Sequence, residues 1–388
     1  MSHKKGTSDS LRLEILSLGE SGVAQREIAR RLRVSLPTVQ RWLARTREAD
    51  GSLPDRVSGR ASNRTSAESE ARVLDSRMRL KSSALGEIGA EAIHRDLVER
   101  GEAAPSVSTI GRVLARSGAL DGKKRTRRPP PPQGWYLANV ADRTAEMDQF
   151  DAVVGLVIRG GTDVEVLNGV SLHGGLVASW PEPSVTTDST LLRLEEHWRQ
   201  FGLPTYAQFD NDTRFQGAHQ FKDSLGRVVR LCHSLGVTPV FAPPREPGLQ
   251  NAIESFNGRW QSKVWNRWEH ADLQELRDRS SAYVAASRKR HALRIEAAPD
   301  RVPFPQTWVL KKRFPLAADV VFIRRSDEQG RISLLGHTFD VDANRPHRLM
   351  RAVVRYQESR IDFHALRRVD PENQPLINQI AYSPRNLN

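Results

Sequence analysis

The stretch AEMDQFDAVVGLVI, residues 145–158, decides the fold of the middle of this chain. Its second half, AVVGLVI, is rich in β-branched residues and predicts the first strand of a sheet, from which an acid projects. Further strands are predicted at 164–177, 204–209 and 236–242, and helices at 189–201, 218–235 and from Gln250 onward. We therefore expect an α/β core with a mixed sheet at residues 138–300.

Three acidic residues stand in distinctive contexts along this segment. Asp148 lies in the predicted first strand, Asp210 ends a strand in YAQFDNDTRF, and Glu254 follows the loop PPREPG at the start of a helix. By spacing alone, any three of the 46 acids in the chain would usually be surface charge. Carboxylates, however, are the oxygen ligands that Mg²⁺ prefers, and two such ions can hold the attacking and leaving oxygens of a phosphodiester. Asp151 is the alternative first acid.

The net charge of +13 is unevenly distributed along the chain. The basic excess lies in residues 1–133 and 301–388, whereas residues 134–300 are slightly acidic. This partition is expected if flanking modules bind a phosphate backbone while a carboxylate site works between them. Double-stranded DNA is therefore the expected partner.

Other features exclude whole classes of protein. The single cysteine, Cys232, excludes intrachain disulfides and a zinc site built on paired cysteines. No glycine-rich phosphate loop is present, so NTP hydrolysis is not expected. No apolar run approaches the roughly 18 residues of a membrane span. We expect a soluble, cytoplasmic protein with no membrane partner.

Residues 1–50 are expected to form a helix-turn-helix DNA-binding domain. Apolar residues follow helical spacing in three short segments, and QREIARRLRVSLPTVQRWLAR, residues 25–45, resembles the motif closely. Ser35 is the expected cap of the third helix, with Pro37 in its first turn. The residues predicted to contact DNA on its non-core side are Thr38, Gln40, Arg41 and Arg45. An ordinary solvated helical hairpin is the alternative.

A second helix-turn-helix unit is predicted at residues 66–121, with helices near 71–80, 88–99 and 108–116. Its exposed DNA-contact candidates are Thr109, Arg112 and Arg116, and the alternative is a spacer bundle. Residues 51–65 are a predicted linker. A second linker at 122–137 contains GKKRTRRPPPPQ, in which Lys123, Lys124 and Arg125 are expected to contact phosphate, although a merely solvated linker is the alternative.

The C-terminal segment, residues 301–388, alternates short apolar stretches with turns. These stretches lie at 319–323, 331–341, 349–356 and 360–366 and predict a small antiparallel β-barrel. The segment is basic, so it is expected to bind DNA or, nearly as readily, another protein.

On these residues the chain resembles the DDE transposase and retroviral integrase superfamily, specifically bacterial insertion-sequence transposases with an integrase-type core. The match rests on Asp148, on Asp210 in FDNDTRF, and on Glu254 in QNAIESFNG. The chain departs from the pattern where Asp212 replaces a turn glycine and where Ala252 replaces the glycine of an NG pair. The resemblance implies a ribonuclease-H-like core and an SH3-like barrel at the C-terminus.

The resemblance also implies a chemistry. Asp148, Asp210 and Glu254 would hold two Mg²⁺ or Mn²⁺ ions, which would serve to cut a transposon end and join its 3′-hydroxyl to target DNA. Asn257 would orient a phosphate or a metal-bound water. Arg259, Lys263 and Arg267 follow at spacings of four and are expected to form one basic stripe along DNA, with a solvated face as the alternative. A homo-oligomer working on terminal repeats at the bacterial nucleoid is expected, with a catalytically inactive DNA-binding regulator as the alternative.

Overall fold

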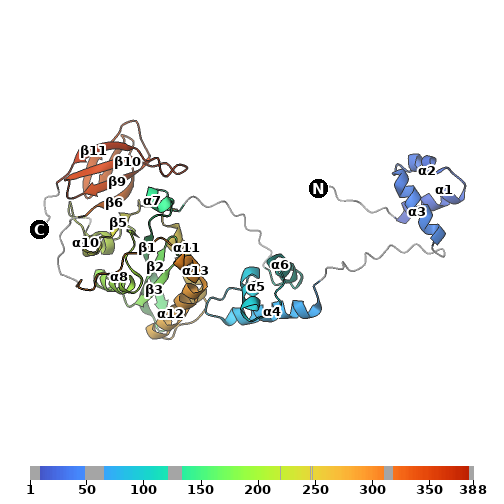
Figure 1. The fold of residues 1–388 in the computed structure, drawn as a ribbon, viewed down its shortest axis with the longest axis horizontal. Coiled ribbons are helices and arrows are strands. Elements are labelled where there is room, and N and C mark those ends of the chain that lie inside the picture. The colour runs from blue at the N-terminus through green and yellow to red at the C-terminus, as the bar shows by residue number, and fades with distance from the viewer. Residues whose placement is uncertain are drawn as a thin grey trace. The chain divides into compact units, whose positions relative to one another are not determined.

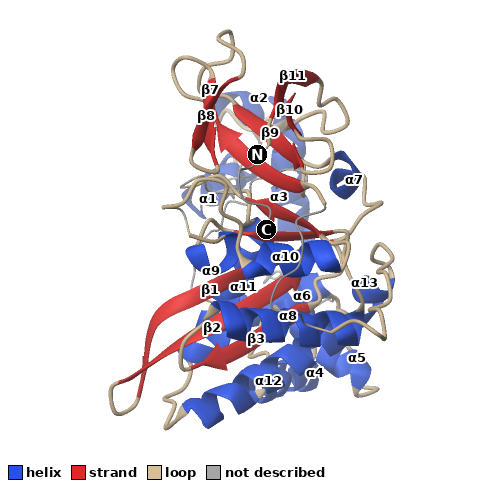
Figure 2. Ribbon diagram, turned by 90° about the vertical axis from the view of Figure 1, so that its left-hand side faces the viewer, coloured by secondary structure: helices blue, strands red, loops and turns tan. Residues whose placement is uncertain are grey.

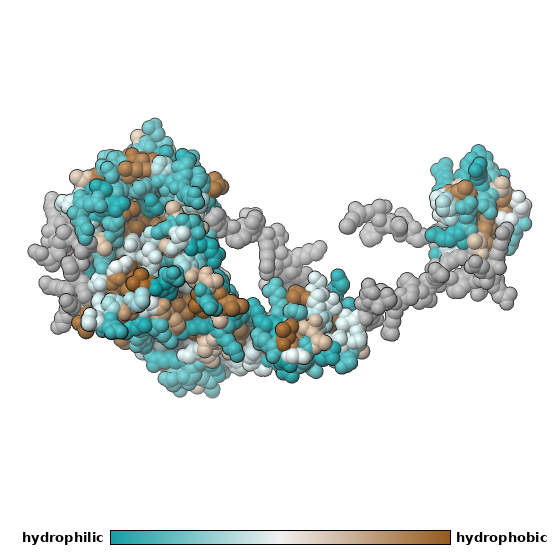
Figure 3. Space-filling model, in the orientation of Figure 1, coloured by the Kyte–Doolittle hydropathy of each residue, from teal (hydrophilic) through white to brown (hydrophobic). Residues whose placement is uncertain are grey.

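The computed structural model describes residues 9–48, 65–120, 133–218, 220–244, 246, 248–309 and 318–383. The chain divides into two compact units, residues 1–72 and residues 73–388 (Figure 1). None of the helices in the described ranges is long and apolar enough to cross a membrane. The face drawn in Figure 3 is largely hydrophilic, with apolar residues gathered in small patches.

The first unit contains the predicted helix-turn-helix. Its helices are α1 (Asp9–Glu20), α2 (Gln25–Arg31) and α3 (Leu36–Glu48). They pack around Ile15, Ile28, Val39 and Trp42, which are the apolar residues of the helical pattern. Ser35 caps α3, because its hydroxyl accepts a hydrogen bond from the Thr38 amide at 3.4 Å. Arg33 occupies the turn with φ of 49°, so a non-glycine residue adopts the left-handed conformation there.

Three further helices form the second predicted helical bundle. They are α4 (Ala67–Ser82), α5 (Ala90–Glu99) and α6 (Val107–Arg116). Their core contains Ile93, Leu97, Ile110 and Leu114. The helix α6 starts where expected, because the Ser106 side chain accepts from the Thr109 amide at 3.3 Å.

The predicted mixed α/β core is confirmed. Its strands are β1 (Met147–Ile158), β2 (Thr162–Ser171), β3 (Val177–Glu182), β4 (Tyr206–Phe209) and β5 (Thr238–Phe241). They lie in the order β3-β2-β1-β4-β5, with β1 to β3 antiparallel and β4 and β5 parallel to β1. The β1–β2 hairpin reaches out past the helices (Figure 2).

Helices cover both faces of this sheet. The helices α8 (Thr187–Phe201), α9 (Thr213–Gln216) and α10 (Arg227–Ser234) pack with Phe150 and Phe209 on one face. On the other face, α11 (Asn251–Trp260), a π-helix at Gln261–Trp265 and α12 (Leu273–Arg290) pack against Val153 and Val166. Short helices α7 (Ala138–Ala141) and α13 (Ala292–Glu296) complete the core. Successive side chains of β1 therefore point to two different helical layers.

The separate C-terminal β-barrel predicted at 301–388 is not confirmed. The strands are β6 (Val320–Arg325), β7 (Arg331–Leu334), β8 (His337–Asp340), β9 (Leu349–Arg355), β10 (Arg360–Ala365) and β11 (Leu376–Ala381). Strand β6 pairs in parallel with β5, so β6, β9, β10 and β11 extend the core sheet to nine strands. Phe241 stacks on Phe322 at this junction, which buries both rings. Among the described strands, β7 and β8 pair only with each other.

Candidate active site

Asp148, the predicted first acid, lies on the α8 face of the sheet and is only 1 % exposed. The Arg301 guanidinium donates to both of its carboxylate oxygens, at 2.9 and 2.6 Å, and the Trp198 indole donates at 3.1 Å. Burial raises the pKa of Asp148, but the charge and hydrogen bonds of Arg301 outweigh that effect and lower the pKa overall. Arg301 and Trp198 thus already donate to the Asp148 carboxylate, and its role as a metal ligand stays a prediction.

Asp151, the alternative first acid, lies on the opposite face of β1, where α11 packs. The two acids are three residues apart on one strand, so their side chains point in opposite directions. Burial, together with the negative charges of Asp210 and Glu254, raises the pKa of Asp151 to about 6. The structure thus brings Asp151, and not Asp148, into the electrostatic environment of the other two acids.

The first turn of α11 is anchored to β1 beside Asp151. The Gln149 side-chain oxygen accepts from the Ile253 amide at 3.1 Å, and Gln149 also donates to Gln208 at 2.5 Å. Gln149 and Asp151 are two residues apart and share a face of the strand. This contact fixes the helical turn that carries Glu254 over the strand that carries Asp151.

Asp210 and Glu254 line one cleft of about 510 Å³, bordered by the Pro243–Pro244 loop after β5. Asp210 follows β4 directly, and its carboxylate accepts from the Asp212 amide at 3.0 Å. The fourth acid of the region, Asp212, contacts Arg214. It accepts a hydrogen bond from the Arg214 amide at 2.8 Å and forms an ion pair with the Arg214 side chain at 2.7 Å. Asp212 therefore caps α9.

A buried arginine that sequence reasoning did not place here holds the Asp210 loop. Arg324 of β6 donates to the Asn211 side chain at 2.6 Å and to the Ala242 carbonyl at 3.1 Å. Asn211 donates in turn to Ala242 at 2.5 Å. Burial lowers the pKa of Arg324 to about 10. The C-terminal strand thus supports the loops after both β4 and β5.

Asn257 lies between Asp151 and a residue of β2. Its side chain donates to Asp151 at 2.7 Å and accepts from Asn168 at 2.8 Å. Asn168 is the register partner of Asp151 in the β1–β2 ladder, so Asp151, Asn168 and Asn257 are all neighbours. The side-chain amide of Asn257 thus binds a carboxylate, and its expected role toward a phosphate or a metal-bound water stays a prediction.

The expected basic stripe on α11 divides into two parts. Arg259 is exposed, whereas Lys263 donates to the Gly86 carbonyl and Arg267 to the Ser83 carbonyl, both at 2.8 Å. The π-helix that contains Lys263 breaks the 3.6-residue periodicity, so residues four apart no longer share a face. Lys263 thus binds the α4–α5 loop, and its burial lowers its pKa.

The predicted DNA-contact residues of the helical regions are placed as follows. On α3, Gln40 and Arg41 are exposed, and the Thr38 hydroxyl lies 2.8 Å from that of Ser35. On α6, Arg112 and Arg116 are exposed and the Thr109 hydroxyl lies 2.9 Å from that of Ser106. The Arg45 side chain and the linker residues Lys123, Lys124 and Arg125 lie outside the described residues.

The chemistry of the donor set suits a hard divalent cation. Asp151, Asp210 and Glu254 offer only carboxylate oxygens, the ligands of Mg²⁺ and Mn²⁺. The mutual repulsion that raises the pKa of Asp151 would be relieved by a bound cation. As the side chains lie, no three Asp, Glu, His or Cys residues of the described ranges surround a single ion position.

Residues 7–55 match the family described as homeodomain-like domain. Among solved structures, the catalytic core domain of BIV integrase shares 17 % identity over 36 % of this chain and 81 % of that chain, with a TM-score of 0.28. A simian T-cell lymphotropic virus intasome shares 13 % over 71 % and 88 %, with a TM-score of 0.33. The HTLV-2 integrase catalytic core domain in complex with magnesium shares 14 % over 40 % and 87 %, with a TM-score of 0.27.

The chain thus joins a segment that matches the homeodomain-like family to a mixed α/β core that carries a cleft lined by acids.

Proposed function

We propose that this chain is a DNA transposase of the bacterial insertion-sequence type, which cuts transposon-end DNA and joins the 3′-hydroxyl to target DNA. The observation that carries the proposal is that Asp210 and Glu254 line one cleft and that their negative charges both act on Asp151. The homeodomain-like match at residues 7–55 supports a DNA substrate.

The three carboxylates would hold Mg²⁺ or Mn²⁺. Two bound ions would supply Lewis-acid stabilisation of the attacking and leaving oxygens during phosphodiester cleavage and transesterification. The protein's own part is to hold the carboxylates in place. Asn257 fixes the Asp151 carboxylate, and Arg324 fixes the loop that follows Asp210.

The flanking helical regions would bind the DNA. Thr38, Gln40, Arg41 and Arg45 would read base edges or contact phosphates from α3, and Thr109, Arg112 and Arg116 would do so from α6. Lys123, Lys124 and Arg125 in the linker would contact phosphate. A homo-oligomer assembled on two transposon ends is the expected working form.

The test begins by sequencing genomic DNA that is recovered with the full chain, which supplies the terminal repeats. Strand transfer is then measured on those ends with Mg²⁺, using Asp210→Asn and Glu254→Gln as controls. Product from wild type alone supports the proposal. Equal product from wild type and both variants would contradict it, and binding without product from wild type would favour a DNA-binding regulator.

A further inference from the structure

A pocket of about 240 Å³ lies along the side of α11, one turn from Glu254, and its charge is positive. Arg259 of α11, Arg294 of α13 and His291 line it, together with the polar residues Asn251 and Ser255. None of the residues that line this pocket is Asp or Glu. A small pocket with several cationic donors and no acid suits an anion.

Some donor groups of the pocket bind backbone carbonyls, and others make no hydrogen bond within the described residues. Arg294 donates to the His173 carbonyl at 2.6 Å through Nε and to the Leu172 carbonyl at 2.8 Å through Nη2. These bonds fix the guanidinium and leave Nη1, which has no hydrogen bond within the described residues. The His291 Nδ1 lies 2.8 Å from the Ser287 carbonyl, which leaves Nε2. Arg259 is exposed and makes no ion pair among the described residues.

The backbone of the β2–β3 turn is shaped to admit the Arg294 side chain. Gly175 has φ of 67°, a conformation that favours glycine, and a Cβ there would lie 3.1 Å from Nη1 of Arg294. The absence of a side chain at this position therefore lets the guanidinium reach the pocket.

The cations around this pocket repel one another. Burial lowers the pKa of His291 and of Arg294, and the charge of Arg259 lowers both further. Glu146 is the acid that acts on Arg294, but its carboxylate already accepts from the backbone amides of Met147, His173 and Gly174 at 2.9 to 3.0 Å. A bound anion would offset this repulsion.

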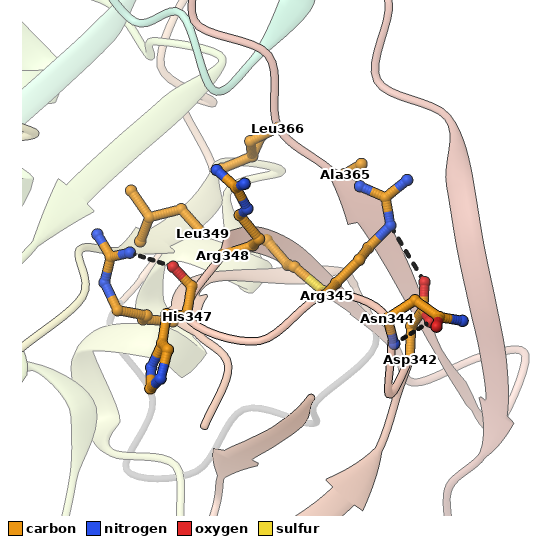
Figure 4. A pocket seen from close by; sticks show the side chains of 10 residues that line it. Asp342, Asn344, Arg345, His347, Arg348, Leu349, Ala365 and Leu366 are labelled. Atoms are coloured by element: carbon orange, nitrogen blue, oxygen red, sulfur yellow. Dashed lines mark hydrogen bonds and ion pairs between the residues drawn. The ribbon is translucent and has the colours of Figure 1, made fainter. Parts of the chain in front are cut away.

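A second basic pocket offers a contrast. It lies by the loop before β9 and is lined by Arg325, Arg345 and Arg348 (Figure 4). There, Arg345 pairs with Asp342 at 3.1 Å and Arg325 pairs with Glu246, so acids of the protein neutralise two of the three arginines. The pocket beside α11 lacks such neutralisation by its own lining.

We propose that the pocket beside α11 binds one phosphate of the DNA strand that passes Glu254, with Arg259 and Nη1 of Arg294 as its charged donors. The inference rests on the proposed function, since it assigns the ligand to a DNA substrate. Gln133, the last residue of the sequence GKKRTRRPPPPQ, also lines the pocket. The pocket would hold the strand in register with the carboxylates, as phosphate contacts do.

The test is a double-mutant cycle in which the protein and the DNA are each changed, and binding affinity is measured in EDTA. A duplex selected by the full chain from genomic DNA is remade with one neutral methylphosphonate at each position in turn. Wild type should lose about tenfold in affinity at the contacted phosphate, as expected for a charged hydrogen bond. Arg259→Gln should lose a similar factor in affinity for unmodified DNA. A methylphosphonate at the contacted phosphate should then cause no further loss in this variant. Lys289→Gln, which removes the same charge from an exposed site on α12, should keep the full sensitivity.

Several outcomes would overturn the inference. One is an Arg259→Gln variant that keeps the wild-type sensitivity at every phosphate, and another is a chain that binds no duplex. Arg259→Lys, which retains the charge, guards against misfolding and should show intermediate coupling. Calorimetry with inorganic phosphate distinguishes a DNA phosphate from a free anion. If free phosphate binds and added duplex does not displace it, the pocket binds a small anion and not DNA. If Arg259→Gln abolishes the sensitivity to one methylphosphonate but the wild type yields no strand-transfer product, the phosphate site is supported and the proposed function is contradicted.

Discussion

The side-chain amide of Asn257 donates a 2.7 Å hydrogen bond to the carboxylate of Asp151, and so links helix α11 to strand β1. Asn168 completes the link by donating to Asn257 at 2.8 Å. Asp151 is thus the acid of β1 that is oriented toward α11, whereas Asp148 is bound to Arg301 on the other face.

We expect Asn257→Ala to reduce strand transfer by about 10- to 100-fold, as is typical when a residue that orients a metal ligand is lost. The apparent affinity for Mn²⁺, measured by calorimetry, should fall with it. Asn168→Ala should cause a smaller loss, and the double variant should lose no more than Asn257→Ala alone, because both act through Asp151. Additive losses in the double variant would contradict the prediction that both asparagines act through Asp151.

Replacing Arg324 with Met should destabilise the protein by roughly 2 to 3 kcal/mol, because the half-buried Asn211 side chain and the Ala242 carbonyl lose a charged, buried donor. Strand transfer per folded molecule should also fall, since the loop that follows Asp210 loses its support. Urea unfolding and single-turnover kinetics measure the two effects. Arg325→Met is the matched control: it breaks the partly exposed pair with Glu246 and an exposed hydrogen bond to the His347 carbonyl, so its cost should stay within about 1 kcal/mol.

His197 should make the fold sensitive to acid. Burial lowers its pKa to about 3, and its ring packs among Phe150, Trp180 and Phe201. In the unfolded chain a histidine has a pKa of about 6.5, so below that pH the unfolded state gains a proton that the folded state refuses. The free energy of unfolding should therefore fall as pH drops from about 6.5 toward 3, by at most ~1.4 kcal/mol per pH unit from this residue. Urea unfolding of His197→Phe should show a shallower pH slope than wild type; an unchanged slope would count against the prediction.

The Asp148–Arg301 pair should behave as a structural ion pair. Arg301→Met leaves a buried carboxylate without its cation, so we expect a loss of roughly 3 to 5 kcal/mol in the free energy of unfolding. Adding Asp148→Asn to that variant should recover part of the loss, because the uncompensated charge is gone. A double variant no more stable than Arg301→Met would show that charge is not the cause.

Much of the local structure could be predicted from the sequence because its causes are local. The helices of the first unit follow from apolar spacing, and α3 starts at Ser35 because a serine there can cap it. The strand β1 follows from its β-branched run, and β4 ends at Phe209, directly before Asp210, as predicted.

The remaining features depend on contacts between distant residues. The sequence shows that Asp148 and Asp151 point to opposite faces of a strand, but not which face meets α11, and Arg301 lies 153 residues from its partner. The alternation of residues 319–366 predicts strands, although 331–341 divides into β7 and β8 and β11 is not predicted. It does not predict that β6 pairs with β5. The single π-helical turn that redirects Lys263 leaves no signal in the spacing of cations.

We propose that Asp151, together with Asp210 and Glu254, forms the metal site. This is tested by Mg²⁺-dependent strand transfer per folded molecule by Asp151→Asn and Asp148→Asn, at a temperature where both are folded. We expect no product from Asp151→Asn and near wild-type product from Asp148→Asn. Product from Asp151→Asn, with none from folded Asp148→Asn, would contradict it.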